Sequence, residues 1–145
     1  MYEQTIPALT QRSWAQSYPG TADQLRHVRH RLRGFLAGCP VQDDAVHLLS
    51  ELCANAIVHT DSGKPGGTFT VRAQHLPHAY VRAEVQDAGS DWHGDLSASA
   101  TYPHGLYLLQ ILASACGTEQ INRTHLVWFR LDYPNGPAPD PAPHL

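Results

Sequence analysis

Residues 48–60 have the sequence LLSELCANAIVHT, an apolar helical segment that carries polar side chains at a fixed spacing. Glu51, Asn55 and His59 are four residues apart. Because an α-helix turns by roughly 100° per residue, these side chains form one stripe that drifts by only about 40° per step. An ordinary solvent face is rich in Lys, Arg and Glu, whereas Asn is a poor helix former. The stripe is therefore either the solvent side of an amphipathic helix or a functional surface.

The rest of the chain surrounds this helix, which we expect at residues 42–60, with strands and two further helices. Period-two alternation predicts strands at residues 13–18, 68–76, 80–86, 118–122 and 126–131. Helical spacing predicts helices at residues 25–36 and from Pro103 to about Leu112, the latter ended by Gly117. Thr21 and Gln24 have the spacing of a capping box at the first helix. This order predicts an α+β fold, a two-layer α/β sandwich with three helices on one face of a mixed, mostly antiparallel sheet.

The domain organisation follows from length and local composition. A chain of 145 residues is enough for one domain. We expect a flexible N-terminus at residues 1–12, the folded domain at 13–133 and a Pro-rich disordered tail at 134–145. The polar segment 88–104 has no clear period, which is typical of a functional loop such as a lid.

Charge, hydropathy and cysteine usage exclude several classes of protein. The net charge is -3, so bulk charge argues against direct binding to nucleic acid. No apolar run approaches the roughly 20 residues of a membrane span, and the N-terminus has no signal-peptide pattern. Three cysteines without a CxxC pair argue against a disulfide framework or a structural zinc site, and Cys53 is expected to be a small core residue. We therefore expect a cytoplasmic protein that does not associate with membranes.

Two further motifs lie at the ends of predicted elements. Asp87-Ala88-Gly89 follows a strand, where a carboxylate can accept a hydrogen bond from an exocyclic amine and Gly89 permits close approach of a flat ligand. A simple Asp-x-Gly turn is the alternative. Gly105 opens the third helix, where backbone N–H groups can bind phosphate; a loop-ending glycine is the alternative there.

Taken together, the order and spacing of these motifs resemble the GHKL (histidine-kinase-like, Bergerat-type) ATP-binding proteins. The chain is most similar to the single-domain actinobacterial group related to anti-sigma-factor serine kinases. Residues 51–59 correspond to the N box, Asp87-Ala88-Gly89 to the G1 box and Gly105-Leu106 to the G2 box. The resemblance covers about residues 13–133.

The resemblance implies ATP and Mg²⁺ as cofactors and assigns a role to each matching residue. Asn55 would offer its amide oxygen to Mg²⁺, which prefers oxygen ligands, and Glu51 would be the catalytic general base. Asp87, assisted by Thr124, would bind the adenine amino group. The implied nucleotide-binding set comprises Asn55, Asp87, Gly89, His104, Gly105, Leu106 and Thr124.

The implied function is that of an ATP-binding regulatory protein, a serine/threonine kinase that binds a sigma factor and phosphorylates a serine of an antagonist protein. A homodimer is a further expectation. Pro103 stands where the fuller G2 box has glycine, and His104 where it often has Arg, which binds a γ-phosphate more strongly than a neutral His. The alternative is therefore a catalytically weak or inert nucleotide-binding module that acts by protein association. The arginine cluster at residues 26–33 is either a solvated surface or a docking face for an acidic partner.

Overall fold

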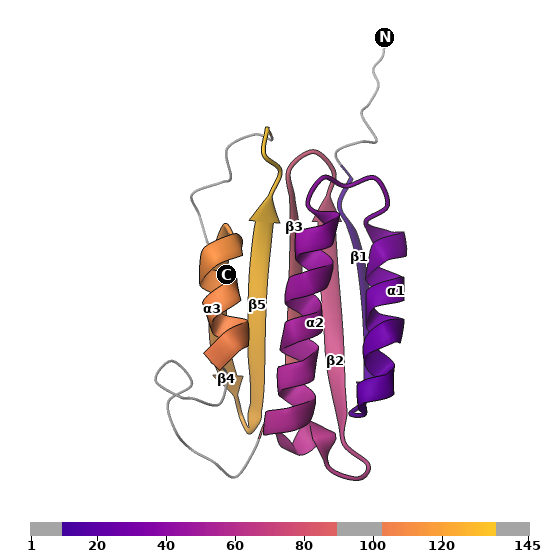
Figure 1. The fold of residues 1–145 in the computed structure, drawn as a ribbon, viewed down its shortest axis with the longest axis vertical. Coiled ribbons are helices and arrows are strands. Elements are labelled where there is room, and N and C mark those ends of the chain that lie inside the picture. The colour runs from indigo at the N-terminus through magenta and orange to yellow at the C-terminus, as the bar shows by residue number, and fades with distance from the viewer. Residues whose placement is uncertain (1–9, 90–102, 136–145) are drawn as a thin grey trace.

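A computed structural model of the protein, which describes residues 10–89 and 103–135, is built around a five-stranded sheet (Figure 1). The strand order is β1-β2-β3-β5-β4, and each of the four pairings is antiparallel. The strands are β1 (Arg12–Pro19), β2 (Thr68–Leu76), β3 (Tyr80–Asp87), β4 (Ala115–Ile121) and β5 (Thr124–Asp132). The sheet, expected to be mixed and mostly antiparallel, is thus antiparallel at every described pairing. The β2–β3 and β4–β5 pairs are hairpins, and α1 and α2 return the chain to the end at which β1 finishes. The α3 connection instead carries the chain from the Asp87 end to the opposite end, so that β5 runs back against β3.

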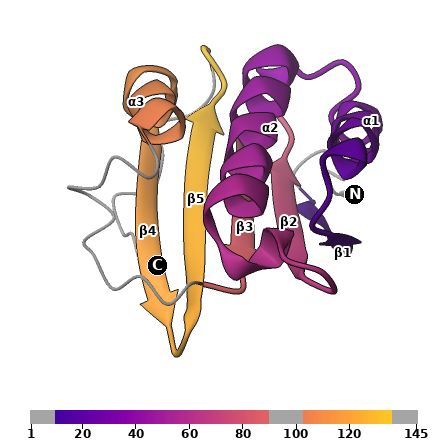
Figure 2. The ribbon, with the colours of Figure 1, turned by 60° about the horizontal axis from the view of Figure 1, so that its bottom comes forward.

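The three helices cover one face of this sheet, which confirms the two-layer α+β architecture (Figures 1 and 2). They are α1 (Leu25–Phe35), α2 (Gln42–His59) and α3 (Pro103–Leu112), and two short 3-10 turns, η2 (Ala22–Gln24) and η3 (Asp61–Gly63), flank α1 and α2. In both views α2 lies at the centre, with α1 over β1 and β2 on one side and α3 over β4 on the other. The site motifs of α2 therefore sit in the middle of the helical layer.

The core lies between the helices and one face of the sheet. Along β3, Val81, Ala83 and Val85 are buried and point to the helices, as the period of two requires. The buried side chains of α2 that meet the sheet include Leu48, Leu49, Leu52 and Ala56. Removing this apolar surface from water is the main force that holds the two layers together.

Two local predictions at element ends are wrong. Thr21 does not cap α1, because a 3-10 turn separates it from the first α-helical residue, Leu25, and Gln24 holds the N-cap position. The Thr21 hydroxyl makes no side-chain cap hydrogen bond and donates to the Asp23 carboxylate. Gly117 does not end α3, which stops at Leu112; it lies inside β4, where a Cβ atom would be 2.7 Å from the indole nitrogen of Trp128. Both corrections arise from contacts that a local pattern does not contain.

Several sequence-based expectations concern the ends and the long loop. The N-terminal residues 1–9, the loop residues 90–102 and the tail residues 136–145 lie outside the described residues, and the first described strand, β1, begins at Arg12. All three cysteines are free, and Cys53 is fully buried in the core as expected. No helix among the described residues has both the length and the apolarity needed to cross a membrane.

Candidate functional site

The polar stripe of α2 lies on the flank of the helix that faces away from α1. Arg29 of α1 donates a hydrogen bond to the Ser50 hydroxyl at 2.8 Å, which places α1 on the Ser50 side of the helix. Glu51 and Asn55 follow roughly 100° and 140° further round the helix. Both are half-buried, whereas His59 is exposed. The stripe is therefore a partly covered surface beside α3 rather than an open solvent face (Figure 1).

Two groups of this stripe have chemistry that a ligand could use. The Asn55 side-chain nitrogen is buried and has no hydrogen-bond partner among the described residues. No ion pair within the described part of the chain holds the Glu51 carboxylate. Cys53, which lies between them in sequence, is different, because burial raises the pKa of its thiol and keeps it uncharged.

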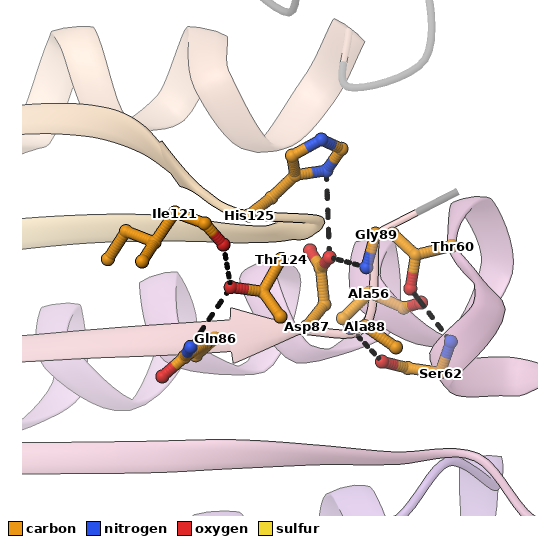
Figure 3. Close-up of polar contacts among 10 residues, drawn as sticks. All are labelled: Ala56, Thr60, Ser62, Gln86, Asp87, Ala88, Gly89, Ile121, Thr124 and His125. Carbon is orange, nitrogen blue, oxygen red and sulfur yellow. Dashed lines mark hydrogen bonds and ion pairs between the residues drawn. The ribbon is translucent and has the colours of Figure 1, made fainter. Parts of the chain in front are cut away.

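Asp87 ends β3 and is held in a tight turn. Its side chain is 3% exposed, and its Oδ1 accepts the Gly89 backbone N–H at 2.7 Å (Figure 3). Gly89 has a φ of 75°, and a Cβ atom there would lie 1.8 Å from the backbone oxygen of Arg123. Only glycine combines this backbone angle with such a close approach, so the turn fixes the carboxylate against the β4–β5 hairpin.

A second set of hydrogen bonds fastens the same turn to the end of α2. The Asp61 N–H donates to the Gly89 carbonyl at 2.7 Å, and the Ala88 N–H donates to the Ser62 hydroxyl at 2.9 Å. Ser62 is itself held by Thr60, whose hydroxyl accepts the Ser62 N–H at 3.0 Å (Figure 3). These residues were not among the predicted site residues, although the polar run directly after the helix was an available signal for them. The hydrogen bonds have a structural consequence. They couple the position of Asp87 to that of the Glu51–Asn55 stripe.

The residue that faces Asp87 across the sheet is His125, not Thr124. Asp87 and His125 are partners in the β3–β5 register, and the His125 Nδ1 lies 3.6 Å from the Asp87 Oδ1. The Thr124 hydroxyl instead accepts from the Gln86 side chain at 3.1 Å and donates to the Ile121 carbonyl at 2.8 Å (Figure 3). The Thr124 hydroxyl thus has two protein partners in the structure, and its predicted part in binding adenine stays a prediction. The signal for His125 was its shared parity with the buried Val127, Phe129 and Leu131.

The third predicted motif lies in the first turn of α3. Pro103 is the first residue of this helix, a position that suits proline because the N–H there has no intrahelical partner. His104, Gly105 and Leu106 follow, and their side chains lie outside what the structure describes. The last residues of α3 lead into β4 at the Arg130 end of β5, so the first turn is directed back towards the Asp87 end (Figure 1). Backbone N–H groups of such a turn suit an anionic ligand.

Comparison with known proteins identifies this arrangement. The family model described as the histidine kinase-like ATPase domain matches residues 18–130. The matched region includes the stripe of α2, the Asp87 turn and the first turn of α3, and it implies that the domain binds ATP. No curated protein matches the chain.

Proposed function

Because the chain belongs to the histidine kinase-like ATPase domain family, we propose that it is an ATP-binding regulatory protein that acts as a serine/threonine kinase of the anti-sigma-factor type. The observation that carries this proposal is the convergence of two elements. The half-buried Glu51 and Asn55 lie on α2, and the α2 end is hydrogen-bonded to the turn that holds Asp87.

In this proposal the nucleotide lies between these elements and the first turn of α3. Asp87 accepts a hydrogen bond from the adenine amino group, and Gly89 lets the base approach the backbone. The backbone around Gly105, with His104 and Leu106, contacts the phosphates. The buried position of Asp87 supports this role, because a hydrogen bond to a carboxylate is stronger in a site that excludes water.

The residues present also fit a magnesium ion. The described residues contain no group of three His, Cys, Asp or Glu side chains placed to hold a metal, so the protein would contribute few ligands. Mg²⁺ commonly binds in this way, through one protein oxygen together with phosphate oxygens and water. Asn55, whose half-buried side chain carries an amide oxygen, is the residue that would hold it. The ion would neutralise phosphate charge when bound.

The proposed reaction transfers a phosphoryl group to a serine of a partner protein. Glu51 accepts the proton from the serine hydroxyl as its oxygen forms a bond to the γ-phosphorus, and the bond between that phosphorus and the oxygen bridging to the β-phosphate breaks. The products are phosphoserine and ADP. A half-buried carboxylate beside the phosphates suits this role, since it combines access to the reacting oxygen with partial exclusion of water.

A binding module without catalysis is the second candidate. Pro103 and His104 stand where an active kinase of this kind has glycine and commonly arginine, and this difference favours weak phosphoryl transfer more than it affects base recognition. Such a protein would act through association with a sigma factor, an antagonist or a second copy of itself.

The arginines of α1 are the candidate docking face for an acidic partner, and their contacts indicate which of them to substitute. Arg29 is hydrogen-bonded to Ser50, and Arg31 lies over the Trp14 ring at 4.9 Å, so the two do not form one free basic face. We propose Arg26 and Arg33 as the docking pair. The double variant Arg26→Glu/Arg33→Glu should weaken capture of an acidic partner and reduce its salt dependence. Unchanged capture would reject this docking face.

Nucleotide binding is tested first by calorimetric titration of ATP and ADP in the presence and absence of Mg²⁺. The wild type should bind in the micromolar range, and Asn55→Ala should lose the dependence on Mg²⁺. Val58→Ala is the matched control, because Val58 lies on the same helix and is 70% exposed. Absence of binding by folded wild type would refute the nucleotide site.

Phosphoryl transfer is tested with γ-labelled ATP and candidate antagonist proteins. The wild type should label a serine of the partner, while Glu51→Gln should bind ATP but transfer no label. If the wild type binds ATP and labels no partner, the binding-module function is supported and the kinase function is rejected.

A further inference from the structure

Asp87 and His125 form a buried pair, of which only Asp87 has a role in the proposed function. The two residues are Cα partners at the end of the β3–β5 ladder, and both side chains point to the helical side of the sheet. They are 3% and 5% exposed. Figure 3 shows the imidazole directed at the carboxylate from the neighbouring strand.

The distance between the two groups is informative. At 3.6 Å, the His125 Nδ1 and the Asp87 Oδ1 are further apart than the roughly 2.7–3.2 Å of a hydrogen bond from nitrogen to oxygen. The His125 Nδ1 is buried and has no hydrogen-bond partner among the described residues. Buried polar atoms almost always have a partner. A side chain held in this way beside a carboxylate is placed for a ligand that meets both groups.

The chemistry of the pair indicates what that ligand presents. The ionised Asp87 only accepts hydrogen bonds. A proton on Nδ1 is favoured at His125, because a nitrogen lone pair would otherwise face the carboxylate oxygen; we assign the tautomer on this electrostatic ground. The pair thus offers one acceptor and one donor side by side. An adenine edge has the complementary pattern, since its exocyclic amine donates and the two ring nitrogens that flank this amine, N1 and N7, accept.

We propose that His125 is a second base-recognition residue, which donates from Nδ1 to a ring nitrogen of adenine beside the amine bound by Asp87. This inference rests on the proposed nucleotide site. It adds His125, which was not among the predicted nucleotide-binding residues, to that site. Thr124, the residue expected to assist Asp87, uses its hydroxyl for Gln86 and the Ile121 carbonyl instead.

The test is a set of titrations with ADP, 1-deaza-ADP and 7-deaza-ADP, each with Mg²⁺, on wild type, His125→Phe and His125→Gln. The two deaza analogues keep the amine and lack one ring acceptor each. The wild type should bind one analogue roughly 3- to 10-fold more weakly than ADP, which corresponds to one neutral hydrogen bond. His125→Phe should bind ADP more weakly and no longer distinguish ADP from that analogue. His125→Gln, which keeps an N–H donor, should recover part of the discrimination.

The outcomes separate this inference from the function on which it rests. If wild type binds ADP and both analogues equally, or if His125→Phe discriminates as the wild type does, the inference is overturned while nucleotide binding stands. If folded wild type binds no ADP, both are overturned. Circular dichroism establishes that each variant is folded, and His125→Gln carries the test if the phenylalanine variant does not fold.

Discussion

Two histidines buried at opposite ends of the sheet, His75 and His125, have very different surroundings. Each is 5% exposed. The His75 Nε2 lies 2.7 Å from the Tyr133 hydroxyl, and its ring packs against Phe35 and Tyr133. His125 instead faces the Asp87 carboxylate at 3.6 Å. His75 makes a short hydrogen bond within the core, whereas His125 is positioned for a further partner. Each ring has a buried Nδ1 without a hydrogen-bond partner among the described residues, but only that of His125 faces a carboxylate. Burial alone therefore does not indicate function; the chemistry of the neighbouring group does.

The largest effect is expected at the His125 end of the sheet, from a substitution that disturbs the turn that holds Asp87. Gly89→Ala should lower the free energy of unfolding by about 3 kcal/mol or more and abolish ADP binding, because a Cβ atom would overlap the Arg123 carbonyl and the positive φ would be strained. Urea denaturation and calorimetry measure the two effects.

Gly66→Ala is the matched control for that substitution. Gly66 has a similar positive φ of 82°, and no heavy atom beyond its two chain neighbours lies within 4 Å of the position where its Cβ would be. Only backbone strain remains, so we expect a loss of about 1 kcal/mol and unchanged ADP affinity. Equal losses for the two variants would contradict the close approach at Gly89.

The next largest effect is a difference in ADP affinity between a variant at the His125 end of the sheet and a variant at the His75 end. Asp87→Asn should weaken ADP binding by roughly 10- to 100-fold, because it replaces a charged acceptor of the adenine amine with a neutral amide. His75→Gln, on β2 at the opposite end of the sheet, should leave ADP affinity unchanged. Isothermal titration with Mg²⁺ measures both. An Asp87→Asn variant that binds ADP as the wild type does would remove this carboxylate from the site.

A smaller effect is expected on stability at the His75 end. Tyr133→Phe removes the hydroxyl that meets the His75 Nε2, which leaves a buried nitrogen without that partner. The free energy of unfolding should fall by about 1–2 kcal/mol, with no change in ADP affinity. Tyr107→Phe on α3 is the control, since Tyr107 is 63% exposed and should change stability by less than about 0.5 kcal/mol. Similar values for the two variants would show that the His75 hydrogen bond contributes nothing.

The smallest effect is a pH dependence. Burial, with the neighbouring charges of Arg12 and His78, holds the pKa of His75 below its ordinary value of 6.5. Below about pH 6.5 the unfolded chain therefore binds a proton at this position that the folded chain does not. Stability should fall as the pH drops from 6.5 towards the folded-state pKa, and the fall should be shallower in His75→Gln. Urea midpoints from pH 5 to 7.5 measure it, and identical slopes would contradict the lowered pKa.

Local patterns in the chain were sufficient for most elements of the fold. The bounds of β2 at residues 68–76 were predicted as found, and α2 differs from its predicted range by one residue. These elements succeed because alternation and helical spacing involve residues close in sequence. The predictions for the Thr21 cap and the Gly117 helix end were wrong because they, too, used only residues close in sequence. A 3-10 turn separates Thr21 from α1, and the Trp128 indole, from a neighbouring strand, determined the surroundings of Gly117.

The sequence by itself determined the candidate groups on α2 and at the end of β3, because Glu51, Asn55 and Asp87 follow from spacing along single elements. Tertiary structure alone decided that His125 rather than Thr124 faces Asp87, and that Ser62 fastens the turn. The physical reason is strand register. Side chains alternate between the two faces of a sheet, so a shift of one residue reverses every assignment, and that register is set by pairing between distant segments.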